Sequence, residues 1–424
     1  MENIGILGLG TVGTGVVELL ESNGDLIAQK LGRQINVKKI LVRDLSRART
    51  PLARGKITAR AEDILEDEEI KIVVELMGGE EPALSFIMRA LENKKHVVTA
   101  NKEVISKYGG QLLEMAGRVG VNLLFEASVG GGIPIIRPMK QCLAANNIYK
   151  ISAILNGTTN YILTQMEETN KDFEEALREA QIHGYAESDP SADIKGLDAA
   201  RKLAILSSIA FNTRVTPDKI YTQGIDGIEL SDIKYARELG YTIKLVATGR
   251  RLGRSVELLV SPVMLRYDHP LSSVRDVFNA VLLEGDAVGR VMFYGRGAGK
   301  MPTASAVIAD IMDAVRNDSG GRMYCTCYNE LDVLDRGAAV SRFYIRLKAQ
   351  DRPGVLAEIS GALGKNNISL SMVIQKDVKN RVAEIVLVTY EVPLKDLERA
   401  LDEIKEYDQV VEIANVIRVE EGVI

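Results

Sequence analysis

The sequence predicts an α/β fold with more than one domain, and three observations support this. A chain of 424 residues is longer than one ordinary hydrophobic core accommodates. Over the first third of the chain, short apolar runs alternate with helical patterns, which favours a parallel sheet. Residues 341–424 follow the order strand, helix, strand, strand, helix, strand, which favours a small antiparallel sheet with two helices on one face.

Residues 1–135 are expected to form a Rossmann-type NAD(P)-binding domain. A strand over residues 3–9 leads through Gly8-Leu9-Gly10-Thr11-Val12-Gly13 into a helical pattern, which is the context that a dinucleotide-binding motif requires. The first glycine permits a tight turn, the second admits a pyrophosphate, and the third lets helix pack on strand. The helix N-terminus then offers N–H groups to phosphate. A glycine turn without a ligand is the alternative interpretation.

The second expected strand, residues 36–42, ends at Arg43-Asp44. An acid at this position binds the ribose 2′-hydroxyl of NAD, whereas an arginine accommodates the 2′-phosphate of NADP. Because the arginine comes first and more basic residues follow, NADP is favoured, while Asp44 leaves NAD open. The following basic residues are Arg47, Arg49, Arg54 and Lys56, for which a solvated loop is a competing interpretation.

Further strands are expected at residues 70–76, 97–99 and 121–125. Ligands of an open parallel sheet gather outside the carboxyl ends of its strands, so Thr99 and Lys102 should lie near the glycine motif's site. After the last of these strands, Glu126 precedes three glycines and Ile133. One acid with several main-chain carbonyls suits a hard cation, although a flexible turn is the simpler interpretation.

The second expected domain, residues 136–320, contains an acidic stretch at 184–203. A helix ends at Gly184, and a loop with Glu187, Asp189 and Asp193 follows, stiffened by a proline. Several carboxylates in so short a span suit the ammonium group of a polar, zwitterionic small molecule. A solvated acidic loop that caps the next helix is the alternative.

The helix after this loop is expected to begin near residue 196 and to carry Asp198 and Lys202 at i and i+4. These side chains share a face, so the lysine could donate a proton to a reacting oxygen close to the acids. An ordinary surface ion pair is the alternative. Leu197, Ala200 and Leu203 are expected on the apolar stripe of this helix.

The rest of this domain is expected to add a second sheet and a second glycine-rich loop. A strand at 148–155 ends in a polar turn at 156–160, and further strands are expected at 241–249, 256–263, 281–289 and 291–294. The glycine-rich loop at 295–303, which includes Gly299, leads into a helix over 304–315. It is a candidate lid or cofactor contact, with a plain loop as the alternative.

After a linker at 321–340, residues 341–424 are expected to form the βαββαβ domain. Its first turn, Asp351 to Gly354, leads into a helix that starts at Val355. A four-stranded sheet of this kind has two exposed edges, and a partner would cover one of them.

Composition excludes several classes of protein. The net charge of −5 does not favour a nucleic-acid or anionic-membrane surface, and no apolar run has the length of a membrane span. Neither a secretory signal nor a disulfide framework is expected, which favours the cytoplasm. The cysteines are Cys142, Cys325 and Cys327, and a zinc site is not expected from them.

The motifs together resemble homoserine dehydrogenase over about the first 320 residues. GLGTVG, TANK, EASVGGGIPII, LNGTTNYI, GYAESDPSADIKGLDAARKL and GRGAGKMPTASAV occur in the order of that family. The C-terminal DRPGVLAEIS and NNISL resemble an ACT domain, a small amino-acid-sensing module. No aspartate kinase half precedes the motifs, so the expected type is monofunctional.

The resemblance implies NAD(P)-dependent interconversion of L-aspartate 4-semialdehyde and L-homoserine in threonine, methionine and isoleucine biosynthesis. It implies that Glu187 and Asp198 bind substrate, that Lys202 is the proton donor, and that Lys102 is a second lysine at the junction of cofactor and substrate. Gly184 and Gly299 would contact the cofactor. A structural Na⁺ would be held by Glu126 with the carbonyls of Val129, Gly131 and Ile133.

For the ACT domain, the resemblance implies feedback inhibition by threonine. The effector would bind near Asp351, Gly354 and Val355 and at Asn366 and Asn367, at a contact in a homodimer or homotetramer. A dimerisation module without a ligand is the alternative. A dehydrogenase of another amino-acid semialdehyde and a non-catalytic amino-acid sensor are the alternatives for the whole chain.

Overall fold

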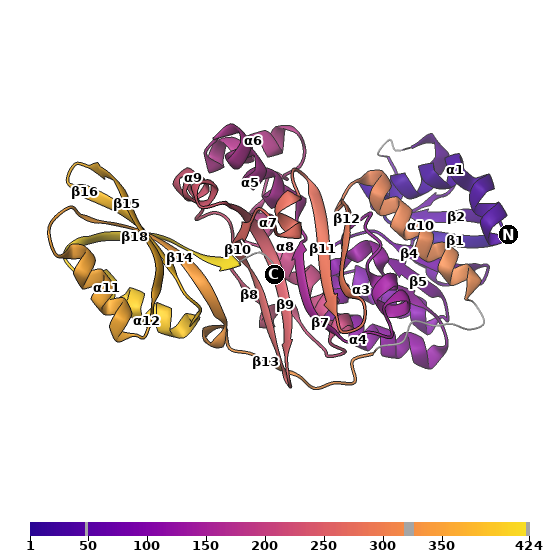
Figure 1. Ribbon diagram of the computed structural model, residues 1–424. Coiled ribbons are helices and arrows are strands. Elements are labelled where there is room, and N and C mark those ends of the chain that lie inside the picture. The colour runs from indigo at the N-terminus through magenta and orange to yellow at the C-terminus, as the bar shows by residue number, and fades with distance from the viewer. Residues whose placement is uncertain (47–49, 318–325, 421–424) are drawn as a thin grey trace. The chain divides into compact units, whose positions relative to one another are not determined.

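The computed structural model describes residues 1–46, 50–317 and 326–420 and shows two compact units (Figure 1). Arg47, Arg49 and Cys325 therefore lie outside the described residues. Each unit is assembled from several chain segments. Unit 1 contains residues 1–151, 201–218 and 279–330, and unit 2 contains residues 152–200, 219–278 and 331–424.

Unit 1 is built on a six-stranded sheet in the order β3-β2-β1-β4-β5-β6, in which every neighbouring pair is parallel. This is the strand order of a doubly wound nucleotide-binding fold, so the predicted Rossmann-type fold is confirmed. The strands are β1 (Glu2–Leu7), β2 (Ile35–Leu41), β3 (Ile57–Thr58), β4 (Ile70–Glu75), β5 (His96–Thr99) and β6 (Leu123–Leu124). The helices that follow them are α1 (Thr11–Leu31), α2 (Glu62–Leu65), α3 (Ala83–Glu92) and α4 (Lys102–Val119).

The core of unit 1 includes a helix from far along the chain. Helix α10 (Lys300–Arg316) packs on α1, and Val307 and Ile311 of α10 are buried with Ile4, Ile6 and Val16. Glycine at position 15 of α1 permits this close approach, since a Cβ there would lie only 2.7 Å from the carbonyl oxygen of Lys300. Unit 1 also contains β11 (Phe278–Gly285), β12 (Gly289–Arg296), most of β7 (Ile148–Ile154) and the short turns Pro51–Ala53, Glu126–Ser128 and Pro138–Cys142.

Unit 2 contains the acidic stretch, a long antiparallel hairpin and the C-terminal domain. The hairpin is β9 (Tyr241–Leu252) with β10 (Ser255–Arg266). The helices before it are α5 (Gly157–Thr169), α6 (Phe173–Ile182), α7 (Ser191–Ile194) and α9 (Leu230–Glu238). Shorter elements of unit 2 are β8 (Tyr221–Thr222), β13 (Asp332–Val333) and the turns Pro270–Ser273 and Arg336–Ala338, while the turn Pro217–Lys219 begins in unit 1 and ends in unit 2. Helix α8 (Leu197–Ala210) runs from unit 2 into unit 1.

The C-terminal domain has the predicted βαββαβ order and a sheet in the order β18-β14-β16-β15. Its elements are β14 (Val340–Gln350), α11 (Val355–Lys365), β15 (Leu370–Lys379), β16 (Val382–Thr389), β17 (Val392–Pro393), α12 (Leu394–Lys405) and β18 (Val410–Glu420). Alternate residues of β14, namely Phe343, Ile345 and Leu347, form a core with the two helices. The predicted pair of exposed edges is wrong, because β18 pairs in parallel with β10 through Val263–Leu265 and Arg418–Glu420.

Three local predictions also need correction. The acidic loop is not wholly irregular, because residues 191–194 form the one-turn helix α7 directly after Pro190. Leu197 does not lie on a buried stripe: its side chain is 45% exposed, whereas Ala200 and Leu203 are buried. The second glycine-rich loop is shorter than predicted, because α10 begins at Lys300.

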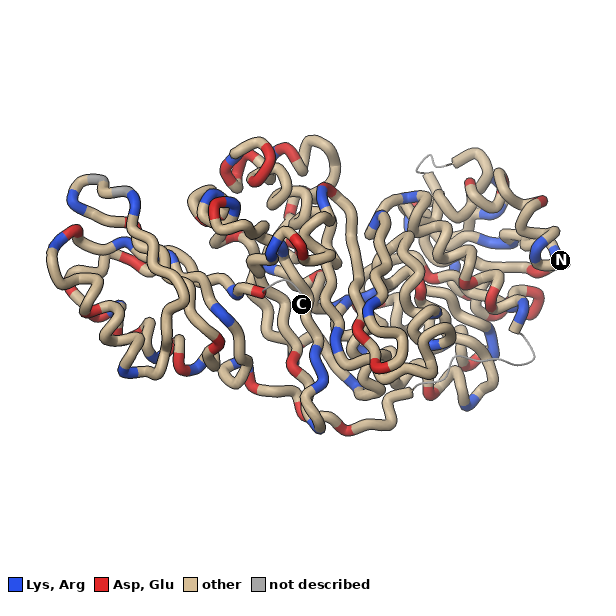
Figure 2. The backbone as a smooth tube through the Cα atoms, viewed as in Figure 1, with Lys and Arg blue, Asp and Glu red and all other residues tan. Residues whose placement is uncertain are grey.

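Charges of both signs are distributed along each unit (Figure 2). This distribution agrees with the small net charge of −5. Among the described residues, no helix has both the length and the apolar character needed to cross a bilayer.

Candidate active site

The glycine motif after β1 shapes a turn that is open to a ligand. Gly8 has a φ of +102°, and a Cβ there would lie 2.8 Å from the carbonyl oxygen of Leu76. A Cβ on Gly13 would lie 2.3 Å from the carbonyl oxygen of Gly8, which explains how α1 approaches the strand end. Around Gly10, by contrast, a Cβ would meet nothing within 4 Å, and α1 has no side-chain cap at its N-terminus. Thr11 and Val12 therefore begin a helix whose first N–H groups suit a phosphate.

The residues after β2 are placed at the surface. Arg43 is exposed, and the Oδ1 atom of Asp44 accepts hydrogen bonds from the backbone N–H of Ser46 at 2.8 Å and from its hydroxyl at 2.6 Å. These hydrogen bonds tie the acid to its own turn, and the arginine beside it is exposed.

A buried carboxylate connects the ends of β4 and β5. Glu75 is fully buried, and its oxygens accept hydrogen bonds from the Thr99 hydroxyl at 2.6 Å and from the Met77 backbone N–H at 2.7 Å. Burial raises the pKa of this carboxyl above its usual value. The Thr99 hydroxyl oxygen accepts in turn from the backbone N–H of Asn101 at 2.9 Å. Lys102, half-buried, is the next residue and the first of α4.

Asn101 completes this connection between the two strand ends. Its amide Nδ2 donates to the carbonyl oxygen of Gly79 at 2.7 Å, and its Oδ1 accepts from the backbone N–H of Val104 at 3.1 Å and so caps α4. The polar residues at the edge of the sheet are therefore fixed before any ligand binds.

The two glycine-rich loops pack against each other. A Cβ on Gly131 would lie 2.5 Å from the carbonyl oxygen of Gly297, and one on Gly132 would lie 2.7 Å from Cβ of Pro302. Gly299 has a φ of +126° and stands directly before α10. The lack of side chains in both loops is therefore a packing requirement as well as a source of backbone freedom.

Glu126 is buried beside these loops and caps the following helical turns. Its carboxylate accepts from the backbone N–H groups of Ile135, Ile136 and Arg137 at 2.5, 2.8 and 2.8 Å. A second buried acid, Asp310, accepts from the backbone N–H of Glu126 at 2.8 Å and from Arg137 at 2.8 Å. Burial, and then the charge of Glu126, raise the pKa of Asp310 to about 8.

This part of unit 1 has the oxygen-rich chemistry of a cation site. No group of three or more His, Cys, Asp or Glu side chains arranged for a metal occurs within residues 1–46, 50–317 and 326–420. A cation at Glu126 would therefore depend on main-chain carbonyls, as those of Val129, Gly131 and Ile133 were expected to provide. It would also offset the repulsion between the two buried acids, so the residues present fit such an ion.

In unit 2, the acids of the stretch 184–203 are gathered around one amide. The Nδ2 atom of Asn156 donates to Asp193 Oδ1 at 2.7 Å and to Asp198 Oδ2 at 3.0 Å. Asn156 also caps α5, since its Oδ1 accepts from the backbone N–H of Thr159 at 2.9 Å. The Thr158 hydroxyl contacts Asp193 Oδ2 at 3.1 Å and donates to the carbonyl oxygen of Tyr185 at 2.7 Å. The structure thus holds two carboxylates close together on one polar turn.

Helix α8 carries Asp198 and Lys202 one turn apart. Their side chains are only 3% and 8% exposed, so the interpretation as a solvated surface ion pair is wrong. Glu187 differs, because it is exposed, and its main-chain carbonyl accepts a hydrogen bond from the Gln181 amide at 3.2 Å. Gly184, with a φ of +72°, is also exposed. The structure therefore places Asp198 in the acid cluster and leaves Glu187 at the surface of the same loop.

The residues expected to bind an effector lie at the two ends of α11. Gly354, with a φ of +96°, immediately precedes the helix, Asp351 lies in the turn before it, and Val355 is its first residue. Asn366 and Asn367 follow its last residue. Eleven helical residues separate the two ends by about 16 Å. One small molecule bound within a single chain would not contact both groups.

Three family models match the chain: the homoserine dehydrogenase NAD-binding domain over residues 8–126, homoserine dehydrogenase over 134–312, and the ACT domain over 343–409. Homoserine dehydrogenase from Synechocystis is 46% identical and aligns with 98% of this chain and 99% of its own length. The chain belongs to the homoserine dehydrogenase family.

Solved structures of homoserine dehydrogenases have the same fold. The enzyme from Thiobacillus denitrificans superposes with a TM-score of 0.94 at 41% identity, covering 99% of this chain and 98% of its own. A hyperthermophilic archaeal homoserine dehydrogenase in complex with NADPH has a TM-score of 0.64 at 29% identity, covering 74% of this chain and 98% of its own. This homoserine dehydrogenase is accordingly an NAD(P)-dependent oxidoreductase that acts on a CH–OH group, and both the family and the fold predicted from sequence are confirmed.

Sequence reasoning assigned no role to two side chains that organise the homoserine dehydrogenase site. Asn156 lies in the motif LNGTTNYI, but only the fold brings it between Asp193 and Asp198. Glu75 occurs within an apolar strand, and the signal that could have revealed it is the presence of a single acid at the end of that buried run. A charged residue rarely occupies such a position unless its hydrogen bonds are satisfied.

Proposed function

We propose that this homoserine dehydrogenase uses Lys202 as the proton donor and acceptor at the substrate oxygen, with Asp198 and Glu187 binding L-homoserine or L-aspartate 4-semialdehyde. The observation that carries the proposal is the pair of acids joined by Asn156, half-buried Asp193 and buried Asp198, with Lys202 buried one helical turn beyond Asp198. In the reductive direction, negative charge develops on the carbonyl oxygen as hydride reaches its carbon. A lysine ammonium donates its proton there as that charge develops.

The bound nicotinamide would supply or accept the hydride. The chain's own contribution is to bind the substrate's ammonium and hydroxyl ends with carboxylates and to hold the reacting oxygen near a lysine. The fixed turn of Thr99, Asn101 and Lys102 supports a second role for Lys102, at the junction of cofactor and substrate. An ammonium in both positions would favour the developing alkoxide.

We propose NADP as the preferred cofactor, with NAD as the alternative. Arg43 at the end of β2 and the engagement of Asp44 with Ser46 support this preference. The nucleotide would contact the Gly8–Gly13 turn, Thr99, Lys102, Gly184 and Gly299. We propose a cytoplasmic location, since three cysteines in 424 residues do not make a disulfide framework of the kind found in oxidising compartments.

We propose that a structural Na⁺ is bound by Glu126 and the carbonyls of Val129, Gly131 and Ile133. The buried, hydrogen-bonded carboxylate and the adjacent Asp310 support an ion at this point. The ion would fix the first glycine-rich loop against the second, and no chemical step is assigned to it.

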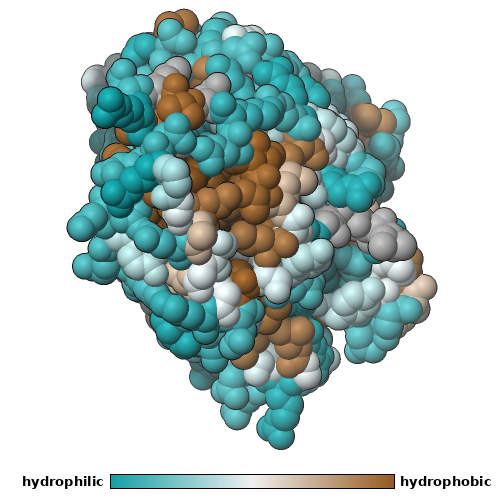
Figure 3. Space-filling model, turned by 60° about the vertical axis from the view of Figure 1, so that its left-hand side comes forward, coloured by the Kyte–Doolittle hydropathy of each residue, from teal (hydrophilic) through white to brown (hydrophobic). Residues whose placement is uncertain are grey.

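We propose that threonine inhibits the enzyme through the ACT domain, in a homodimer or homotetramer. The two ends of α11 support a site shared with a second copy, since Asp351, Gly354 and Val355 of one copy would meet Asn366 and Asn367 of the other. Strand β15 is the last strand of its sheet, and Met372 and Val373 on it are 41% and 43% exposed. Figure 3 shows that apolar surface is exposed on one face of the molecule, as self-association would require.

We propose the domain arrangement given by the sequence: residues 1–135 for the nucleotide, 136–320 for substrate and dimerisation, 321–340 as a linker and 341–424 as the ACT domain. The family models support this division at 8–126, 134–312 and 343–409.

The deciding experiment follows the absorbance of reduced nicotinamide with homoserine and either NADP or NAD, each with and without threonine. We expect reduction with a preference for NADP and suppression by threonine. Activity that ignores threonine would leave the catalytic proposal intact and remove the effector. Activity on another amino-acid semialdehyde but not on homoserine would contradict the substrate assignment.

A further inference from the structure

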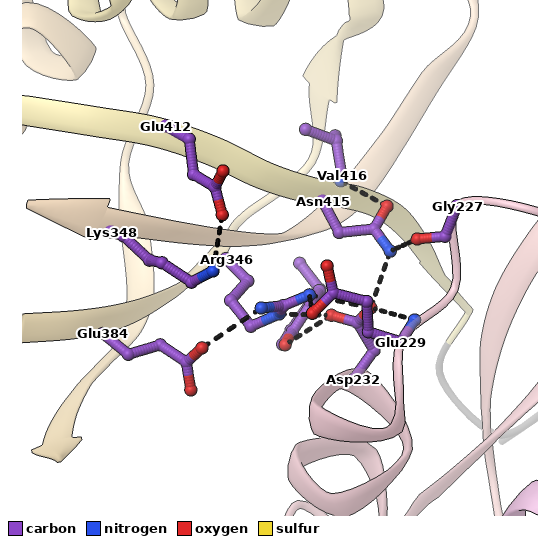
Figure 4. Close-up of polar contacts among 10 residues, drawn as sticks. Gly227, Glu229, Asp232, Arg346, Lys348, Glu384, Glu412, Asn415 and Val416 are labelled. Carbon is purple, nitrogen blue, oxygen red and sulfur yellow. Dashed lines mark hydrogen bonds and ion pairs between the residues drawn. The ribbon is translucent and has the colours of Figure 1, made fainter. Parts of the chain in front are cut away.

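A buried carboxylate at the start of α9 is held by three side chains of the C-terminal domain. Asp232 is fully buried, and Arg346 donates to it twice, from Nε at 2.7 Å and from Nη2 at 3.2 Å. The Tyr344 hydroxyl donates to Oδ1 at 3.1 Å, and the Asn415 amide donates to Oδ2 at 2.7 Å. Figure 4 shows Arg346 of β14 and Asn415 of β18 pointing toward Asp232.

Arg346 is the centre of this cluster and belongs to the face of β14 opposite the helices. Residues 343, 345 and 347 form the core with α11 and α12, so Tyr344 and Arg346 point the other way. Arg346 is fully buried, and its guanidinium also contacts Glu229 at 3.0 Å and Glu384 at 3.1 Å. Burial opposes its ionisation, but the hydrogen bonds to Asp232 outweigh this and raise its pKa. Removing either partner would leave an uncompensated buried charge, so α9 is held firmly to the sheet.

The segment before α9, residues 224–228, connects this cluster to the substrate loop, and we call it the strap. Asn415 donates to the carbonyl oxygen of Gly227 at 2.9 Å, which fixes one end of the strap. At the other end, the backbone N–H of Ile225 donates to the carbonyl oxygen of Ile194 at 2.9 Å. A Cβ on Gly224 would lie 2.4 Å from that same oxygen, so the two backbones are in direct contact.

Ile194 lies between the acids of the active site. It directly follows Asp193, and the backbone N–H of Gly196 donates to the carbonyl oxygen of Asp193 at 2.9 Å, immediately before α8 and Asp198. Any movement of the strap therefore displaces the turn on which the carboxylate pair depends. The side-chain amide of Asn156 joins those two carboxylates.

We propose that the Arg346–Asp232 cluster and the strap transmit effector binding from the ACT domain to the substrate carboxylates. An effector that shifts β14 and β18 shifts Asp232 with them, and the strap then moves the 194–196 turn. The movement separates Asp193 and Asp198 from their positions around Asn156 and weakens substrate binding. This inference rests on the proposed inhibition by threonine, and it assigns the route rather than the effector.

The test compares Arg346→Met with Lys348→Met in the full-length enzyme. Lys348 lies two residues further along the same face of β14 and pairs with exposed Glu412 at 2.6 Å, so it is a matched control that does not contact Asp232. For each variant, equilibrium dialysis measures threonine binding, and initial rates give the half-saturating homoserine concentration with and without threonine. Allosteric couplings typically change affinity by about fivefold or more.

We expect R346M to bind threonine and to remain active with a raised half-saturating homoserine concentration, while the shift that threonine adds to that concentration falls below about twofold. K348M should keep the full shift. An R346M enzyme that binds threonine and is inhibited like the wild type would overturn the route. If R346M does not fold, the same comparison with Arg346→Lys, which keeps the charge but loses the two-pronged contact, replaces it.

Hydrogen exchange separates failure of the route from failure of the effector proposal. In the absence of any ligand, R346M should raise exchange in peptides covering residues 190–200 as well as 225–235, and K348M should leave both unchanged. This readout does not require threonine, so it applies even if the wild-type enzyme proves insensitive to it. Faster exchange confined to 225–235 would overturn transmission to the substrate turn.

Discussion

Lys244→Met should change how the stability of the enzyme depends on pH. Lys244 on β9 is 1% exposed, and its ammonium donates to Asn160 Oδ1 at 3.1 Å and to the carbonyl oxygen of Val274 at 2.7 Å. Burial lowers its pKa from 10.5 to about 8. Between these values the unfolded chain binds more protons than the folded one, so stability rises with pH through this interval.

The size of the effect follows from the shift. The pKa of Lys244 differs by 10.5 − 8 = 2.5 units between the unfolded and the folded chain. The free energy of unfolding therefore differs by about 3 kcal/mol between a pH at which this lysine is charged in both states and a pH at which it is neutral in both. About 1 kcal/mol of this increase in the unfolding free energy should appear between pH 7 and pH 9. Methionine cannot ionise, so K244M should lack this increase. It also loses two hydrogen bonds, but that loss does not depend on pH and leaves the slope as the diagnostic quantity.

Urea unfolding of wild type and K244M at pH 7, 8 and 9 measures this slope. The difference in unfolding free energy between the two proteins should change by about 1 kcal/mol in favour of the wild type as the pH rises. Lys234→Met on α9 is the matched control, because Lys234 is exposed and should leave the slope unchanged. Parallel pH curves for wild type and K244M would refute the argument that a charged lysine is held in a dry site.

Four further results are expected. Lys202→Ala should lower turnover by ~10²–10⁴-fold while titration of cofactor fluorescence shows unchanged binding, whereas Lys195→Ala, in an exposed position of the same stretch, should keep full activity. Homoserine oxidation should accelerate in alkaline buffer because the lysine must first lose its proton, and a flat rate from neutral pH upward would exclude lysine as the base. Glu75→Leu should lower the free energy of unfolding by about 1–3 kcal/mol, because it leaves the Thr99 hydroxyl and the Met77 N–H without their acceptor. It should also raise the KM for the cofactor. Thermal unfolding measures the first effect and initial rates the second, and wild-type values would contradict the positioning role of Glu75. Arg43→Ala should weaken NADP about tenfold or more and leave NAD unaffected, as KM values for the two cofactors would show.

Local chemistry explains why so much of the fold was predictable. The strand, glycine turn and helix at residues 2–31 are each dictated by neighbours in sequence, since Gly8 and Gly13 are required by contacts within the motif and with the adjacent strand. The same holds for the βαββαβ order. The sequence does not predict helix α7, because a proline such as Pro190 favours a stiff loop. In the structure Pro190 stands directly before the helical turn.

Tertiary placement explains what was missed. Asp232, Arg346 and Glu384 each have the sequence context of surface residues, and only the packing of α9 on β14 buries the first two. Likewise Asn156 joins two acids that lie about forty positions away, through a turn that no periodicity describes. Leu197 fits the helical apolar stripe by spacing, yet it is 45% exposed. Spacing indicates which face a residue occupies, but it does not indicate what packs there.

The parallel pairing of β18 with β10 determines what removal of the C-terminal domain would do to the rest of the enzyme. Deleting the C-terminal domain would remove β18 and leave backbone N–H and C=O groups of Val263–Leu265 unpaired at the edge of a long hairpin. It would also leave Asp232 without its guanidinium partner. Such an uncovered edge favours aggregation, so a truncated enzyme is expected to be lost to inclusion bodies. The role of the C-terminal domain is therefore better studied by point substitutions in a full-length chain than by shortening it.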